Sequence, residues 1–300
     1  MRYRFQTETT DTVSRLDQFL ALRIPDLSRT ELRARIELGG VHIQGKRVRK
    51  CGLQLKAGCK VELYLDRGPL RPFRLKPANI LYRDPWLLAV NKPAGVESQP
   101  TPARLKGCLY EAVETYLQMS RTEVAHRGRQ NKETMVQRLD RDTSGVIILS
   151  IHKASHAKLT EMVRRRALTR EYLALVEGCP ASDVGEYRNL LARRSRGRSV
   201  AVHSGGKEAV TRFRLLQQFS DYSAIAATLL TGRTHQIRAQ FSENGHPLLG
   251  DKKYGGATEI CGVTIPRHCL HARRLSLIHP ITGQALEIEA PVPQDLLRFL

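Results

Sequence analysis

The pattern of apolar and polar positions predicts several short strands and two longer helices after residue 80. Apolar runs rich in β-branched and aliphatic residues predict the strands, whereas apolar residues at helical spacing predict helices over 154–166 and 235–244. Because strands and helices do not alternate regularly, we expect an α+β domain with a mixed, mainly antiparallel sheet and flanking helices. The predicted strands cover 87–90, 146–150, 172–176, 225–230 and 286–288.

The first 68 residues predict a small helix-helix-sheet domain. Ser28 and Glu31 have the spacing of a capping box at the start of the second helix, and Gly39 ends that helix. Residues 69–79 contain three prolines and little periodicity, so they predict a linker before a larger domain over 80–300. The short strands expected in the small domain cover 41–43, 46–48 and 61–65.

The chain carries a strong positive charge. Its 300 residues contain 49 Lys and Arg against 29 Asp and Glu, a formal net charge of +20, which attracts polyanions such as RNA, DNA or an anionic membrane. The apolar runs fall far short of the roughly 20 residues that span a bilayer, and the N-terminus lacks the apolar segment of a secretory signal. We therefore expect a cytoplasmic protein without a membrane partner.

The cysteines and histidines do not form a recognisable metal motif. The six cysteines are dispersed without a C-x-x-C pair, and Cys261, His268, Cys269 and His271 match none of the common zinc spacings, so no metal is expected. The glycine-rich motifs that bind nucleotide cofactors are absent from the sequence as well. Without a cofactor, the chemistry must come from ordinary side chains.

A dense polar segment over 137–145 stands directly before a predicted buried strand. In this segment Asp140 and Asp142 alternate with Arg138 and Arg141. Such a run can form a salt-bridged surface turn, and it can equally present a carboxylate on a loop that a rigid strand supports. Taken alone, the segment leaves both interpretations open.

A second polar segment over 230–238 is followed by a glycine-containing segment over 245–251. Thr234 is the expected N-cap of a helix, which places Arg238 about one turn into that helix. Gly245 is expected to end it.

These two segments, together with residues 170–178, resemble the RluA-type pseudouridine synthases. The resemblance implies an RNA-modifying isomerase that needs no cofactor. It covers nearly the whole of the predicted large domain. The further matching segments are 81–95, 271–275, 279–283 and 290–296.

The resemblance also implies roles for individual residues. Asp140 would be the catalytic aspartate, Arg238 the arginine that pairs with its carboxylate, and Tyr172 the aromatic residue near the target uracil. The family often has a histidine where Gln137 stands. This difference leaves the carboxylate in place, but it puts in doubt any RNA contact through a ring at position 137.

The N-terminal residues 15–65 resemble a small RNA-binding module shared with a ribosomal small-subunit protein. The implied partner of the whole chain is structured RNA, with large-subunit ribosomal RNA favoured over tRNA, and a monomer is the expected state. RNA contacts are expected from basic residues of the small module and from polar residues around the two segments. The expected contact residues are Arg29, Arg33, Lys46 and Arg47 in the module and Arg138, Arg141, Thr143, Arg233, His235 and Gln236 in the large domain.

Two further stretches are interpreted as basic loops that clamp RNA. One covers residues 118–134 and is rich in charged and polar residues, and the other covers 193–198 and carries four arginines. An ordinary exposed loop is the alternative for both.

Two other functions compete with the synthase. A non-catalytic RNA-binding or ribosome-assembly protein predicts the loss of Asp140, Arg238 or Tyr172, and all three are present. A glycoside hydrolase usually needs a second carboxylate at the scissile bond, for which Asp142 is the candidate, and it does not explain the positive charge. Release of free base would distinguish a hydrolase from an isomerase, which retains the base.

Overall fold

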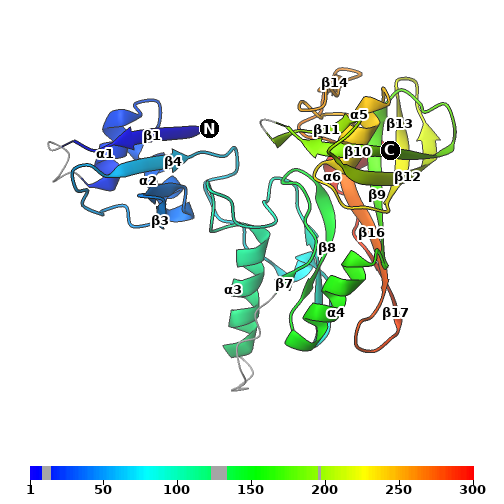
Figure 1. Cartoon of the computed structure of the whole chain (residues 1–300), viewed down its shortest axis with the longest axis horizontal. Coiled ribbons are helices and arrows are strands. Elements are labelled where there is room, and N and C mark those ends of the chain that lie inside the picture. Colours follow the sequence, from blue (N-terminus) through cyan, green and yellow to red (C-terminus); the bar gives the residue numbers. More distant parts are fainter. Residues whose placement is uncertain (9–14, 123–133, 195–196) are drawn as a thin grey trace. The chain divides into compact units, whose positions relative to one another are not determined.

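The computed structural model describes residues 1–8, 15–122, 134–194 and 197–300, and backbone contacts divide the chain into two compact units (Figure 1). The first unit comprises Met1–Lys76 and Gly95–Gly128, and the second comprises Pro77–Ala94 and Arg129–Leu300. The domain boundaries expected from the sequence stay a prediction, because this division places the segment after residue 94 with the first unit.

The two expected RNA clamps fall partly outside the described residues. Residues 123–133 of the first stretch and Ser195 and Arg196 of the second belong to the part that the structure leaves undescribed. Their role in clamping RNA therefore stays a prediction.

The first unit is a four-stranded antiparallel sheet with two packed helices. The sheet has the order β1-β4-β2-β3, and β1 is a strand that the sequence pattern did not predict. The Ser28 side chain accepts a hydrogen bond from the backbone N–H of Glu31, and Gly39 ends the helix with a positive φ of 94°, so both predicted helix boundaries are confirmed. The elements are β1 (Arg2–Gln6), α1 (Leu16–Arg23), α2 (Arg29–Leu38), β2 (Val41–Ile43), β3 (Lys46–Val48), β4 (Lys60–Tyr64) and α3 (Leu109–Thr122).

The second unit is built on one 11-stranded sheet, whose main path has the order β11-β10-β12-β13-β9-β16-β8-β6-β5. Strand β17 pairs with β16 and β7 with β8, and among the described pairs of this sheet only β16 and β8 run parallel. The predicted α+β class with a mixed, mainly antiparallel sheet is therefore confirmed. Its strands are β5 (Ile80–Arg83), β6 (Leu87–Lys92), β7 (Thr134–Met135), β8 (Ser144–Ser150), β9 (Leu168–Glu177), β10 (Val184–Arg193), β11 (Ser199–Val202), β12 (Lys207–Gln218), β13 (Tyr222–Leu229), β16 (Leu270–Ile278) and β17 (Ala285–Glu289).

Short helices flank the sheet of the second unit. The helix α5 packs against β10, β11 and β12, whereas α4 packs against β8 (Figure 1). Within the described residues, no helix has the length and apolar character needed to cross a lipid bilayer. The remaining elements are η2 (Pro77–Asn79), α4 (Lys153–Arg164), α5 (Gln236–Glu243), the two-stranded β14 (Glu259–Ile260) and β15 (Val263–Thr264), and α6 (Gln294–Leu297).

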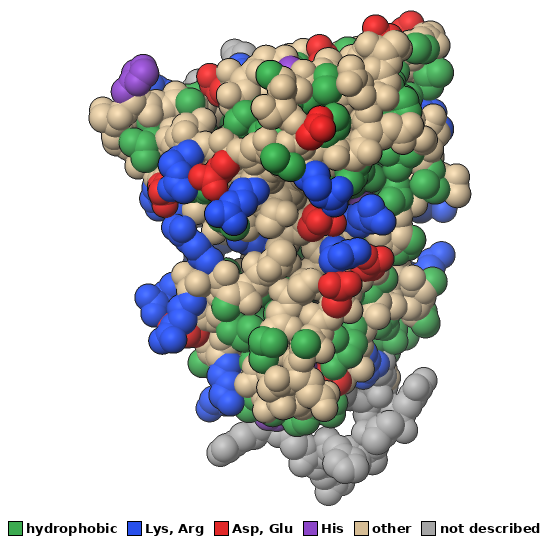
Figure 2. Space-filling model, turned by 90° about the vertical axis from the view of Figure 1, so that its right-hand side faces the viewer, with side chains coloured by type: hydrophobic (Ala, Val, Ile, Leu, Met, Phe, Trp, Pro, Cys, Tyr) green, Lys and Arg blue, Asp and Glu red, His purple; other side chains and the backbone are tan. Residues whose placement is uncertain are grey.

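Opposite charges lie side by side on the surface of the second unit. Figure 2 shows Lys and Arg side chains next to Asp and Glu side chains on one face. Exposed pairs in this unit include Arg188 with Glu186 at 2.9 Å and Arg212 with Glu186 at 3.0 Å. Because solvent screens such pairs, we assign them to the solvated surface rather than to a site.

Candidate active site

The register of the sheet brings the predicted catalytic segments together. Gly145 of β8 pairs with Ala272 of β16, and Ala272 in turn pairs with Tyr172 of β9. The polar segment that carries Asp140 leads into the start of β8, and β16 separates this strand from β9, which carries Tyr172. The pairing of β8, β16 and β9 thus brings the segment after Asp140 and the strand of Tyr172 into the same part of the sheet.

Asp140 and Arg238 form an ion pair between segments 98 positions apart. Arg238 Nη1 donates a hydrogen bond of 2.7 Å to Asp140 Oδ2. The Asp140 side chain retains 27% of its exposure, whereas the Arg238 side chain retains 8%. The pairing that the resemblance implied is therefore present, and the carboxylate remains accessible to a substrate.

Arg238 is held by a second carboxylate that the sequence analysis did not single out. Its Nε and Nη2 donate hydrogen bonds of 2.6 and 2.8 Å to the two oxygens of Asp251, whose side chain is 1% exposed. This fork fixes the guanidinium plane, which leaves Nη1 directed at Asp140. The signal in the sequence was an aspartate between Gly250 and two lysines, a few residues after the helix that carries Arg238.

The electrostatic environment keeps Asp140 ionised. Burial alone would raise the pKa of Asp140, but the charges of His235 and Arg238 and the Arg238 hydrogen bond outweigh burial, so that the pKa lies below its ordinary value of 3.8. Burial lowers the pKa of His235 to about 4, so this ring is neutral at pH 7. At neutral pH the charge that stabilises the carboxylate is therefore that of Arg238.

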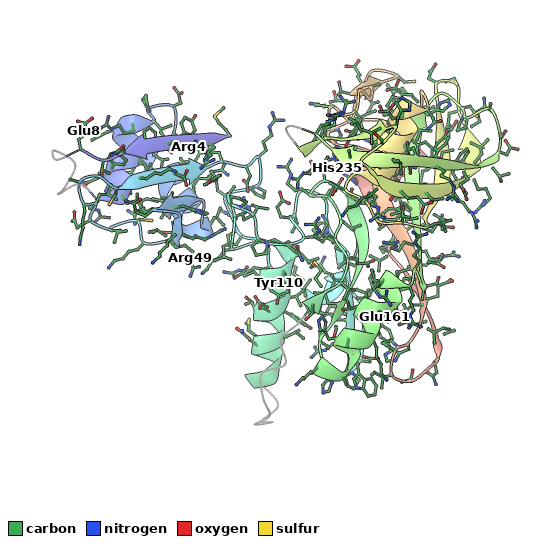
Figure 3. The ribbon with its side chains drawn as sticks, in the orientation of Figure 1. Arg4, Glu8, Arg49, Tyr110, Glu161 and His235 are labelled. Carbon is green, nitrogen blue, oxygen red and sulfur yellow. The ribbon has the colours of Figure 1, made fainter. Side chains whose placement is uncertain are left out.

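His235 lies beside the same carboxylate, at the N-terminal end of α5 (Figure 3). Its Nε2 lies 3.7 Å from Asp140 Oδ2, and its Nδ1 lies 2.9 Å from the Tyr254 hydroxyl, which accepts a hydrogen bond from the Ser199 N–H. His235 occupies the helix N-cap in a left-handed conformation with φ 53°, so the predicted N-cap at Thr234 is wrong.

The hydrogen bonds around Tyr254 indicate the tautomer of His235. Burial raises the pKa of Tyr254, so its hydroxyl is protonated. Among the described residues, His235 Nδ1 is the atom placed to accept a hydrogen bond from this hydroxyl. We therefore assign the imidazole proton to Nε2, where it faces Asp140.

Buried polar contacts support the loop between Asp140 and β8. Thr143 Oγ1 lies 2.8 Å from His268 Nε2, and Ser144 Oγ lies 2.9 Å from His271 Nδ1. The fully buried Lys92 donates from Nζ to the Arg141 carbonyl at 2.9 Å. These contacts use the two histidines that the sequence analysis weighed as metal ligands, and the described residues contain no group of three or more potential ligands.

Tyr172 is buried and lies within electrostatic reach of Asp140. Its side chain belongs to the core of the second unit, with 7% of the residue exposed. Burial raises the pKa of Tyr172, and the Asp140 charge adds to this effect against the opposing charge of Arg170. The phenol is therefore protonated at neutral pH, so it offers a ring face and a hydroxyl proton rather than a phenolate.

The structure gives the other expected contact residues of the large domain different surroundings. Arg138 is exposed, whereas Arg141 pairs with Asp142 at 2.9 Å, as in the salt-bridged turn considered above. Arg233 donates to the Glu208 carbonyl at 2.8 Å. Thr143 and Gln236 are buried with hydrogen bonds inside the protein, so their side chains hold the loops in place instead of facing solvent.

The expected contact residues of the N-terminal unit also differ in their exposure and in their bonding partners. Arg33 and Lys46 are exposed. Arg29 pairs with Asp17 at 3.1 Å, and Arg47 donates to the carbonyls of Gly39 and Thr101 at 2.9 and 2.7 Å. Arg47 therefore joins two segments of the unit, and RNA contact by the four residues stays a prediction.

Replacement of Gly145 by alanine is expected to destabilise the second unit by about 2 to 5 kcal/mol. Gly145 has a φ of 117°, and a Cβ there would collide with the Ala272 carbonyl in the parallel strand. The measurement is urea unfolding. Gly283→Ala is the matched control, because Gly283 also has a positive φ but open space around it. Equal losses in the two variants would contradict the proposed close approach of β8 and β16.

Replacement of Tyr254 by phenylalanine is expected to cost about 1 to 3 kcal/mol of stability, because the buried Ser199 N–H loses its acceptor. Turnover is expected to slow, because His235 loses its hydrogen-bond partner beside Asp140. Tyr222→Phe is the control, since its hydroxyl bonds to the Phe299 carbonyl, away from Asp140. Urea unfolding and product formation measure the two effects. Turnover that falls no more in Tyr254→Phe than in the control would remove Tyr254 from the site.

Comparison with known proteins agrees with this arrangement. Residues 86–243 match the family model described as RNA pseudouridylate synthase. The chain is 35% identical to the ribosomal large subunit pseudouridine synthase D of Pasteurella multocida, over 95% of this chain and 90% of that protein. It is 32% identical to the uncharacterized RNA pseudouridine synthase YlyB of Bacillus subtilis, over 95% of this chain and 93% of that protein.

Two solved structures are similar to this chain. The human RNA pseudouridylate synthase domain containing 4 has a TM-score of 0.59 and 22% identity, covering 73% of this chain and 90% of that chain, a likeness of fold alone. The human RNA pseudouridylate synthase domain containing 1 has a TM-score of 0.53 and 26% identity, covering 71% of this chain and 82% of that chain.

Proposed function

The chain belongs to the RNA pseudouridylate synthase family, and from this premise we propose that it modifies uridines of large-subunit ribosomal RNA with Asp140 as the reacting carboxylate. The protein is an isomerase that converts uridine in RNA to pseudouridine. One contact carries the assignment of the site: Arg238 Nη1 lies 2.7 Å from Asp140 Oδ2 and joins the two sequence segments in which the resemblance was found.

The reaction rearranges one nucleotide without a net change in its atoms. The C1′–N1 glycosidic bond breaks, a C5–C1′ bond forms, C5 loses a proton and N1 gains one. Asp140 is ionised, partly exposed and held at Oδ2 by Arg238, so it can attack the nucleotide or take a proton from C2′. A deuterium isotope effect at C2′ distinguishes these two routes.

Tyr172 contributes a ring and a proton next to the carboxylate. Because its phenol is protonated, we assign it to packing against the target uracil and to hydrogen bonding as a donor. The proton that leaves C5 therefore needs an acceptor other than Tyr172 in its resting state.

The choice of ribosomal RNA rests on the relatives and on charge. The Pasteurella multocida protein, which is named for the ribosomal large subunit, aligns over 95% of this chain. The net charge of +20 suits a folded polyanion, whose target nucleotide must be extruded from its stack at a cost of a few kcal/mol. We expect the protein to act as a monomer, in the cytoplasm, where ribosomal RNA is present.

The competing functions lack comparable support. A decayed, non-catalytic protein would not need the Asp140, Arg238 and Asp251 arrangement. Asp142, the second carboxylate of a hydrolase, is engaged by Arg141 through both of its oxygens. An assay for free uracil tests the hydrolase directly, and an isomerase releases none.

Mapping pseudouridines in total RNA from cells with and without the protein tests the proposed substrate. We expect one or a few uridines of the large-subunit ribosomal RNA to lose their modification in cells without the protein. A change confined to tRNA would replace ribosomal RNA as the substrate. Identical maps in the two strains would overturn the proposal.

A further inference from the structure

A groove of about 410 Å³ lies within the first unit, and none of the proposed catalytic residues lines it. Its volume falls in the range of pockets that bind small molecules or single nucleotides. Four segments form it: the C-terminal half of α2, the residue after β3, residues 70–72 and residue 106. The lining residues are Ala34, Glu37, Leu38, Arg49, Leu70, Pro72 and Lys106.

A buried ion-pair network holds one wall of the groove in place. Asp66 accepts hydrogen bonds from Arg35 at 2.8 Å and from Arg104 at 2.9 Å, and Arg104 also donates to the Pro69 carbonyl at 2.7 Å. The Arg104 side chain is only 4% exposed. Because both arginines converge on one carboxylate, the segment before Leu70 is fixed to α2 rather than free to move.

Backbone contacts fix the other wall. The backbone N–H groups of Leu105 and Lys106 both donate to the Leu38 carbonyl, at 2.7 and 3.1 Å. Gly107 has a φ of 75° and no room for a Cβ beside Pro72, so the segments that carry Lys106 and Pro72 lie in close contact. The backbone segments that form the groove are therefore held in place by the fold.

The groove is lined by two positively charged side chains that have no carboxylate partner among the described residues. Arg49, which Figure 3 labels after β3, and Lys106 are exposed, and within the described residues neither forms an ion pair or a side-chain hydrogen bond. Glu37 is the single carboxylate in the lining, and Cys51 Sγ lies 3.7 Å from its Oε1. Leu38, Leu70 and Pro72 supply apolar surface between these charges.

We propose that this groove binds one single-stranded nucleotide of the RNA substrate, with a base that carries an exocyclic amino group. The inference rests on the proposed RNA substrate. Arg49 and Lys106 face the phosphates, and the base packs on Leu38, Leu70 and Pro72. Glu37 accepts a hydrogen bond from the amino group of cytosine, adenine or guanine and repels the O4 acceptor of uracil. The nucleotide bound here is therefore distinct from the uridine that is isomerised.

Fluorescence anisotropy with labelled single-stranded C8 and U8 oligonucleotides and the full chain tests this proposal. C8 contains no uridine, so its binding is measured without turnover. We expect C8 to bind about twofold to tenfold more tightly than U8, the effect of one hydrogen bond at an exposed site. Glu37→Gln is expected to remove this preference, because an amide can donate to uracil O4 as well as accept.

The double variant R49S/K106S is expected to weaken the binding of both oligonucleotides. If both cations contact phosphates, the slope of log affinity against log salt falls by about 1.4, at about 0.7 per contact for a single strand. K56S/K60S is the matched control, because it removes two exposed cations from the same unit outside the groove. This control is expected to keep the wild-type slope and the C8 preference.

Two results would overturn the groove proposal: equal binding of C8 and U8 by the wild type, or equal effects of the double variant and its control. Neither result bears on the pseudouridine maps, which test the proposed substrate. If the pseudouridine maps change but one of these two binding results is found, the proposed function stands and the proposed nucleotide site in the groove does not.

Discussion

Replacement of Asp140 by asparagine is expected to slow pseudouridine formation by about 10⁴-fold or more, the usual scale for loss of a reacting group. Asparagine keeps an oxygen that can accept the Arg238 hydrogen bond, but it is neither a nucleophile nor a base. The measurement is tritium release from RNA that contains [5-³H]uridine, because C5 loses its hydrogen when the C5–C1′ bond forms.

RNA affinity and stability serve as the controls for Asp140→Asn. Phosphate contacts dominate the affinity of RNA-binding proteins, so the loss of one negative charge should leave affinity unchanged or slightly increased. Asp142→Asn is the matched variant, since Asp142 is paired with Arg141 in the same loop. Loss of activity in Asp142→Asn with retention in Asp140→Asn would reverse the assignment of the two carboxylates.

Replacement of Arg238 is expected to affect folding and turnover together. Arg238→Ala leaves the buried Asp251 carboxylate without its partner, which typically costs about 3 to 5 kcal/mol. Arg238→Lys retains the charge but cannot bond to both oxygens of Asp251 and to Asp140 at once. Urea unfolding measures the stability of the two variants.

The pH dependence of turnover separates the two roles of Arg238. In the wild type the pKa of Asp140 lies below 3.8, so ionisation of this residue contributes stability at neutral pH that is lost only as the pH falls through that lowered pKa. In Arg238→Lys the effect of burial is opposed less strongly, so the pKa of Asp140 rises and the acid limb of kcat moves to higher pH.

Arg104→Lys is the control for this pH effect, because Arg104 is equally buried in an ion pair with Asp66 in the other unit. It is expected to lose stability while the acid limb stays in place. An acid limb that does not move in Arg238→Lys would show that Arg238 does not set the ionisation of Asp140.

Much of the fold was accessible from the sequence because local signals agree with the tertiary structure. The run that forms β8 is buried along its whole length, and the Ser28 cap and Gly39 bound α2 as predicted. The strands β10 and β12 were missed, because they carry charged residues on a half-exposed surface and lack a continuous apolar run. The strand β1 was missed for a similar reason, since exposed and half-buried residues alternate along it.

The candidate site was only partly accessible from the sequence. Asp140 and Arg238 came from a resemblance, and the structure brings them into contact, whereas their roles in catalysis stay predictions. Asp251 was missed because its function depends on two hydrogen bonds to Arg238. The helix cap at Thr234 was predicted wrongly, because a tertiary contact with Tyr254 accompanies the left-handed conformation of His235.

Catalysis by Asp140 on ribosomal RNA is tested by mapping pseudouridine in purified, unmodified large-subunit ribosomal RNA after incubation with the protein. Carbodiimide treatment followed by primer extension locates each product as a stop. Catalysis by Asp140 predicts a new stop at one or a few uridines with the wild type and none with Asp140→Asn. The same stops with both proteins, or no stop with the wild type, would contradict it.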